Sequence, residues 1–144
     1  YEFYLAGERD HGNPQNITDE EMNRILGNKN LKYLGKLDVE TELSNFDISI
    51  IMSSHEGFSR ILLESLYVGL YCLAYRIQGT EVMGHFKNLE LIPMNQINEF
   101  KKCIENFKGD IDNLYNMQLV EESYTSRVVA FQFEKIYKDL DVHN

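Results

Sequence analysis

Basic residues are few in this sequence. Fourteen lysines and arginines stand against twenty-three aspartates and glutamates, which gives a net charge of −9 at pH 7. An acidic surface repels the phosphate backbone of nucleic acids and anionic membrane surfaces, so we expect no nucleic-acid partner. A phosphorylated ligand must be held locally instead, by backbone N–H groups or the positive end of a helix.

Cysteines and long apolar runs are also scarce. Cys72 and Cys103 are too few for a disulfide framework and too far apart for a CxxC motif, which favours free thiols in a reducing compartment. No apolar run approaches the roughly 20 residues that a membrane-spanning helix needs. The 43% hydrophobic content suits one folded domain over residues 1–144, and because the sequence enters a strand-like run directly at Tyr1, we expect a piece of a longer protein.

Hydrophobic patterning predicts strands that alternate with helices. The predicted strands are residues 1–6, 31–34, 46–52, 71–75 and 89–92. The predicted helices are 19–27, 39–43, 59–68, 95–107 and 123–140, with a polar loop at 8–16 and a turn at Gly79. Segment 46–52 is apolar on both faces, so we expect it in the middle of the sheet. We expect the aromatic residues of 123–140 in the core, with some of them exposed if a second domain has been removed. The order implies an α/β, Rossmann-like parallel sheet with helices on both faces.

Ligands of such sheets bind beyond the carboxyl ends of the strands, where segment 53–59 follows the most apolar strand. Glu56 stands there, although a carboxylate at that position also stabilises a helix N-terminus by about 0.3–1 kcal/mol. Glu64 lies within an apolar helix, so it occupies either the one solvated stripe or a contact with a partner. Gly57 allows close backbone approach, and the free N–H groups of the following turn suit a phosphate.

Residues 53–64, S-S-H-E-G-F-S-R-I-L-L-E, resemble the EX7E segment of retaining GT-B glycosyltransferases, the glycosyl transferases group 1 family. Residues 31–35, 46–50 and 69–82 resemble further blocks of that family, in the same order. Tyr71 and Gln78 depart from the pattern, since the family usually has Pro and Gly there. The resemblance implies that the chain is the C-terminal donor-binding half of a GT-B enzyme.

The resemblance also implies a role for each matching residue. Glu56 would be catalytic and contact the transferred sugar near its reacting carbon, while Glu64 would accept hydrogen bonds from the ribose hydroxyls. Tyr33 and Leu34 would lie near the nucleobase. The backbone would hold the sugar and diphosphate through six consecutive residues: Gly57, Phe58, Ser59, Arg60, Ile61 and Leu62.

The activity that the resemblance implies is hexosyl transfer from a nucleotide-sugar with retained configuration, and the isolated domain would be inactive. No cofactor and no metal are expected, because the helix N-terminus and basic side chains replace the cation. The acceptor, a glycan or lipid-linked glycan, would bind an N-terminal domain absent from this sequence, as is the first strand and helix of this domain. By analogy we expect bacterial surface polysaccharide biosynthesis in the cytoplasm, with peripheral membrane association of the full-length protein at the inner membrane.

Other functions fit less well. A receiver-like signalling module needs an acidic pair after its first strand and an aspartate after its third, where this sequence has Gly7-Glu8 and Ser53-Ser54. A non-catalytic nucleotide-binding domain remains an alternative that the presence of both Glu56 and Glu64 argues against. Two segments imitate a D-x-D metal motif, Asp110-Ile111-Asp112 and Asp139-Leu140-Asp141. Both stand near predicted helix ends, where capping of the helix explains their aspartates. The four histidines do not have metal-ligand spacing.

Overall fold

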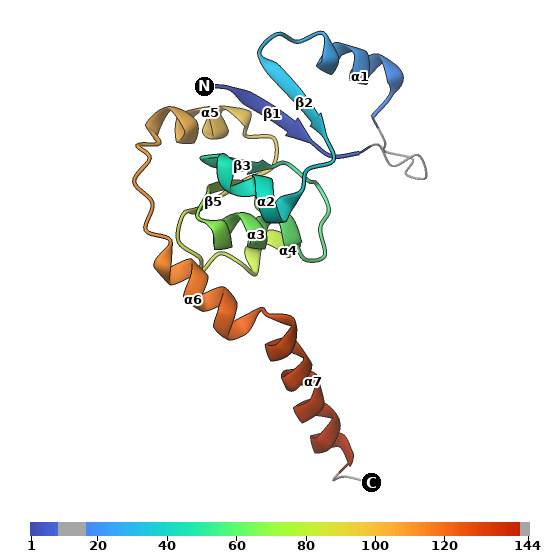
Figure 1. The fold of residues 1–144 in the computed structure, drawn as a ribbon, viewed down its shortest axis with the longest axis vertical. Helices are drawn as coiled ribbons and strands as arrows, with labels where there is room; N and C mark the ends of the chain where they lie inside the picture. Colours follow the sequence, from blue (N-terminus) through green and yellow to red (C-terminus); the bar gives the residue numbers. More distant parts are fainter. Residues whose placement is uncertain (9–16, 142–144) are drawn as a thin grey trace. The chain divides into compact units, whose positions relative to one another are not determined.

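The computed structural model describes residues 1–8 and 17–141, and their side chains through residue 138. The polar loop predicted at 8–16 therefore falls almost wholly outside the described residues, as do His11 and His143. The chain forms two compact units, Tyr1–Leu43 and Ser44–Asn144 (Figure 1).

The first unit is a β–α–β arrangement. Its elements are β1 (Phe3–Ala6), α1 (Asp19–Leu26), β2 (Leu31–Gly35) and the short α2 (Val39–Glu42). Strands β1 and β2 are parallel. A capping box begins α1, because Glu21 N donates to Thr18 Oγ1 (3.2 Å) and Thr18 N donates to Glu21 Oε2 (2.9 Å). Asp38 caps α2 by accepting from Glu40 N.

The second unit contains a three-stranded parallel sheet in the order β3 (Ile48–Ile51), β4 (Tyr71–Tyr75) and β5 (Leu89–Ile92). Its helices are α3 (Arg60–Val68), α4 (Gln78–Glu81), α5 (Ile97–Asn106), α6 (Leu114–Ser123) and α7 (Ser126–Asp141), and a 3-10 turn spans Leu43–Asn45 at the boundary between the units. The middle strand is β4, so the expectation that segment 46–52 is central is wrong within this sheet. The reason is burial: Cys72, Leu73 and Ala74 are fully buried, whereas Ile50 of β3 is exposed.

Helices cover both faces of this sheet, as predicted. Leu73 and Tyr75 of β4 face α5 and pack in one cluster with Ile92 and Phe100. The alternate residues of β4 point to the other face, on which α3 lies (Figure 1). There α3 buries Leu62, Ser65 and Leu66, and Ser65 Oγ donates to Ser49 Oγ of β3 at 3.0 Å.

The structure differs from the sequence prediction at three helices. Residues 78–81 form α4 instead of a turn, because Thr80 bonds back to the segment before it and closes a helical turn. Helix α6 was not predicted, since its buried face includes a polar residue, Asn116. Asn116 Nδ2 donates to Lys87 O at 2.7 Å, and Lys87 N donates to Asn116 Oδ1 at 3.0 Å. Consequently α7 begins at Ser126 instead of Ser123.

The aromatic residues of α7 are exposed, which corrects the expectation that they belong to the core. Phe131, Phe133 and Tyr137 each have more than half of their surface accessible. None of the helices in the described part of the chain is both long and apolar enough to cross a membrane.

Leu73→Ala tests the assignment of β4 as the centre of the fold. Leu73 is fully buried between β3, β5 and α5, so its truncation should lower the free energy of unfolding by about 2–5 kcal/mol. Leu114→Ala is the matched control, because Leu114 is 63% exposed and its truncation should cost less than about 0.5 kcal/mol. Urea unfolding followed by far-UV circular dichroism measures both, and equal losses would contradict the assignment.

Candidate functional site

The segment between β3 and α3, residues 52–59, forms the candidate site at the carboxyl end of the sheet. Glu56 is half-buried in this loop. Together with Ser54, His55 and Gly57 it lines a cavity of about 310 Å³, whose remaining wall is Ile77 and Gln78 at the start of α4. This is the position at which open parallel α/β sheets bind their ligands.

Gly79 fixes the Glu56 backbone from the far side of the loop. A Cβ on residue 79 would lie 2.9 Å from the Glu56 Cβ and closer still to its carbonyl group, so only glycine fits. Thr80 anchors this part of α4: its buried hydroxyl donates to Tyr75 O at the end of β4 (2.6 Å) and accepts from Ile77 N (3.1 Å). The carboxyl end of the central strand therefore positions Glu56 through direct backbone packing.

The N-terminus of α3 opens at the end of the same loop. The N–H groups of the first helical turn have no carbonyl partner within the helix, and they carry the positive end of the helix dipole. Ser59 occupies the N-cap position, yet its side chain makes no capping bond. It is 1% exposed, and its hydroxyl oxygen has no hydrogen-bond partner among the described residues. The start of α3 thus retains unused hydrogen-bonding capacity.

The other residues predicted to bind phosphate differ in the burial of their side chains. The Leu62 side chain belongs to the core, while Arg60 and Ile61 are exposed. A ligand at the start of α3 therefore meets the backbone of residue 62 and not its side chain, as the backbone role predicted for it requires.

Glu64 lies on the accessible stripe of α3 and not in its buried face. It is half-buried and shares that stripe with exposed Arg60 and Val68. Among the described residues no hydrogen bond or ion pair to its carboxylate is present, so its acceptor oxygens are available. Glu64 does not line the Glu56 cavity, and it lies five helical positions, about 7.5 Å along the axis, beyond Ser59. One ligand must extend along α3 to reach both.

Tyr124 is a residue of this region that the sequence analysis missed. It ends α6, and its ring stacks on Phe58 with centroids 6.0 Å apart. The Tyr124 hydroxyl lies 3.3 Å from His85 Nε2, and Phe86 packs against the same ring at 5.6 Å. Phe58 is therefore held by a partner more than sixty residues away, and no local sequence pattern could have indicated it.

Tyr33 and Leu34 belong to the first unit. The Tyr33 hydroxyl donates to Gly7 O at 2.7 Å and joins the end of β2 to that of β1, while Leu34 is exposed. Their place near a nucleobase stays a prediction, as does the absence of a metal.

In the described part of the chain no three His, Cys, Asp or Glu side chains gather as a metal site. Asp112 accepts from Leu114 N, the first residue of α6, at 3.2 Å, while Asn113 occupies the N-cap position without a side-chain capping bond.

Comparisons with known proteins agree with this architecture. The family model described as "Glycosyl transferases group 1" matches residues 1–110. The crystal structure of Anabaena HepE in complex with UDP-glucose has a TM-score of 0.64 at 20% identity, covering 96% of this chain and 40% of that chain. HepE in complex with UDP and glucose has a TM-score of 0.67 at 19% identity, covering 96% and 39%.

These matches show the parallel-sheet, Rossmann-like α/β fold of GT-B glycosyltransferases. The chain spans about two fifths of the HepE chains. A search of curated proteins found no significant match.

Gly79→Ala tests the packing that positions Glu56. The new methyl group would collide with the Glu56 backbone, which cannot move aside without displacing the loop, so the free energy of unfolding should fall by about 1–3 kcal/mol. Gly57→Ala is the matched control, because a Cβ there meets no atom within 4 Å. Chemical denaturation of both variants decides the matter: a Gly79→Ala variant as stable as the control would show that the contact is not tight.

Tyr124→Ala tests the support of Phe58. Loss of the ring should lower the free energy of unfolding by about 1–3 kcal/mol and shift the backbone amide resonances of residues 56–58, since an aromatic pair stabilises beyond the area that it buries. Tyr124→Phe keeps the ring and removes only the hydroxyl beside His85, so it should leave those resonances nearly in place. Unchanged amides in Tyr124→Ala would mean that Phe58 holds its position without Tyr124.

Proposed function

Because the chain belongs to the glycosyl transferases group 1 family, we propose that it binds the nucleotide-sugar donor of an enzyme that transfers the sugar to an acceptor with retained anomeric configuration. The observation that carries this proposal is the half-buried Glu56 in a cavity beside the open N-terminus of α3. A carboxylate and an anion-binding helix end thus stand next to each other at the carboxyl edge of the sheet.

The reaction breaks the bond between the sugar carbon and the diphosphate, so negative charge develops on the leaving group. The first-turn N–H groups of α3 are suited to stabilise that charge, because they are oriented before the reaction and need no rearrangement. Residues Ser59, Arg60, Ile61 and Leu62 supply them. Such local binding is required in a chain whose net charge is −9, since the overall field opposes an anionic donor.

Glu56 acts at the sugar end of the donor in this proposal. Its half-buried carboxylate accepts hydrogen bonds from sugar hydroxyls near the reacting carbon, while Gly57 and Phe58 present backbone to the sugar. Gly79 and Tyr124 support the loop from two sides and so hold Glu56 and Phe58 in a fixed relation. Rigid placement of this kind lowers the entropy that must be lost when the reactive geometry forms.

Glu64 acts at the nucleoside end. Its two carboxylate oxygens accept from both ribose hydroxyls, and charge-assisted bonds of this kind contribute about 1.5–3 kcal/mol. The length of α3 between Ser59 and Glu64 separates the diphosphate from the ribose. In the same proposal, Tyr33 and Leu34 lie near the nucleobase.

We assign the chain to one C-terminal donor-binding domain and the acceptor, a glycan or lipid-linked glycan, to a further domain. The support is that each HepE chain is about two and a half times as long as the part of it that this chain matches. A hexosyl donor, catalysis without a metal, and a place in bacterial surface polysaccharide synthesis at the cytoplasmic side of the inner membrane complete the proposal by family analogy.

Glu64→Ala and Glu56→Ala separate the two carboxylate roles. Glu64→Ala should weaken binding of UDP, GDP or ADP, whichever binds the parent chain, by about 5- to 150-fold, because the ribose loses its charged acceptor. Glu56→Ala should leave nucleotide affinity nearly unchanged and abolish sugar transfer in an enzyme that contains the whole catalytic machinery. Isothermal titration gives the affinities, and product formation from the nucleotide-sugar gives the activity.

The matched control is Glu105→Ala, an exposed glutamate on α5 that pairs with Lys101. It should change neither quantity. Equal losses of nucleotide affinity at positions 56 and 64 would overturn the division of roles, and no nucleotide binding by the folded parent protein would overturn the function.

A further inference from the structure

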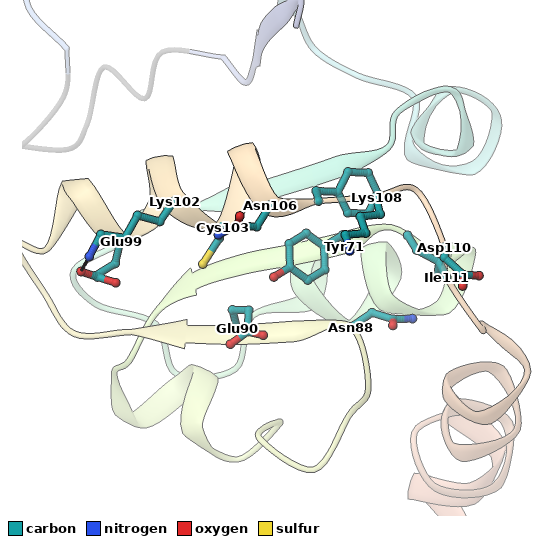
Figure 2. Close-up of a pocket in the computed structure, with 11 residues that line it drawn as sticks. Tyr71, Asn88, Glu90, Glu99, Lys102, Cys103, Asn106, Lys108, Asp110 and Ile111 are labelled. Carbon is teal, nitrogen blue, oxygen red and sulfur yellow. Dashed lines mark hydrogen bonds and ion pairs between the residues drawn. The ribbon is translucent and has the colours of Figure 1, made fainter.

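A larger cavity, of about 580 Å³, opens at the amino ends of β4 and β5, the end of the sheet opposite to Glu56. Its walls come from the first residues of these strands, one side of α5 from Glu99 to Asn106, and the following segment 107–111 (Figure 2). We call it the Tyr71 pocket. Its size lies within the range of small-ligand sites, and no step of the proposed transfer uses it.

A fixed aromatic surface lies within the Tyr71 pocket. The Tyr71 and Phe107 rings stack almost in parallel, with an angle of 7° and centroids 5.1 Å apart. Tyr71 also packs against the cluster of core residues beneath α5, so its ring has little freedom. A ligand that packs against these rings meets side chains that are already held in place, which reduces the entropy lost on binding.

The hydrogen-bonding groups beside this ring are neutral donors and charged acceptors. Burial, with the nearby Glu90 carboxylate and Cys103 thiol, raises the pKa of Tyr71 to about 12, so its hydroxyl stays protonated and can donate. Burial and Glu90 also raise the pKa of Cys103, which keeps that thiol uncharged. Figure 2 shows the Tyr71 hydroxyl directed toward Cys103 and Glu90, with Asn106 above them on α5.

The charges of the pocket disfavour a phosphorylated ligand. Lys102 Nζ donates to Glu99 Oε1 at 2.7 Å, which neutralises that pair. The other charged residues that line the pocket are Glu90, Asp110 and Lys108, with an excess of one negative charge. An anion would be repelled, whereas a neutral molecule rich in hydroxyl groups meets both donors and acceptors.

We propose that the Tyr71 pocket binds one sugar ring of a neutral glycan. The polarised C–H groups on one face of the sugar lie against the accessible part of the Tyr71–Phe107 stack, and the sugar hydroxyls bond to the Tyr71 hydroxyl, Glu90 and Asn106. That this glycan is the acceptor or product of the transferase rests on the proposed function. Since the pocket and Glu56 lie at opposite ends of the sheet, it holds a part of the glycan distant from the reacting end.

Titration of the ¹⁵N-labelled chain with neutral tetrasaccharides of glucose, galactose or N-acetylglucosamine tests this inference. At least one should shift the amides of residues 71, 90 and 103 saturably and leave those of 54–57 in place. Glu90→Gln and Tyr71→Phe each remove one hydrogen-bonding function, keep the shape of the side chain, and should weaken that binding by about 2- to 12-fold. Glu105→Gln, on the same helix as Cys103 but outside the pocket, should have no effect.

Three results would overturn the inference: no saturable shift with any tetrasaccharide at millimolar concentration, shifts confined to residues 54–57, or binding of spermidine at the pocket in place of the sugars. Titration with UDP keeps this test separate from that of the proposed function. Glycan binding without UDP binding would support the pocket and count against the donor site, while UDP binding without glycan binding would do the reverse. Glu90→Gln should leave UDP affinity unchanged.

Discussion

Strand β4 has no exposed face, and this constraint organises the second unit. Cys72, Leu73 and Ala74 are fully buried, so helices must cover the sheet on both sides, α5 on one and α3 on the other. Both faces of β4 are therefore closed to ligands. The Glu56 cavity lies at the carboxyl end and the Tyr71 pocket at the amino end, and the same packed strand supports both.

Backbone packing against β4 fixes the position of the loop at the carboxyl end of this strand. Thr80 bonds to the last carbonyl of β4, Gly79 next to it touches the Glu56 backbone, and the loop then leads into α3. The carboxylate and the helix N-terminus are therefore positioned by covalent neighbours and by close contacts. In an acidic chain this matters, because the groups that can hold an anionic ligand are backbone N–H groups whose positions depend on the fold.

Much of the fold was predictable from local patterns. The strand 71–75, the strand 89–92, the capping box at Thr18 and the end of α3 at Gly69, which has a φ of +92°, all follow from residues close together in sequence. Helix α6 was not predictable in this way. Its buried Asn116 reads as a surface residue until the two hydrogen bonds to Lys87, 29 positions earlier, are known. The aromatic residues of α7 were expected in the core but are exposed, because an apolar helix face in a sequence does not reveal whether another element covers it.

The sequence alone determined which residues could form the candidate site and the order in which they follow a strand and begin a helix. The resemblance of residues 53–64 and of three further blocks to one family depends on spacing along the chain, and the family match over residues 1–110 confirms the family, while the roles of the site residues stay predictions. Tertiary structure alone decided that Gly79 packs on Glu56, that Tyr124 supports Phe58 and that Tyr71 stacks on Phe107. These contacts join residues 23 to 66 positions apart, and their geometry arises only when the sheet and its helices pack together, since no local pattern encodes which distant side chains meet.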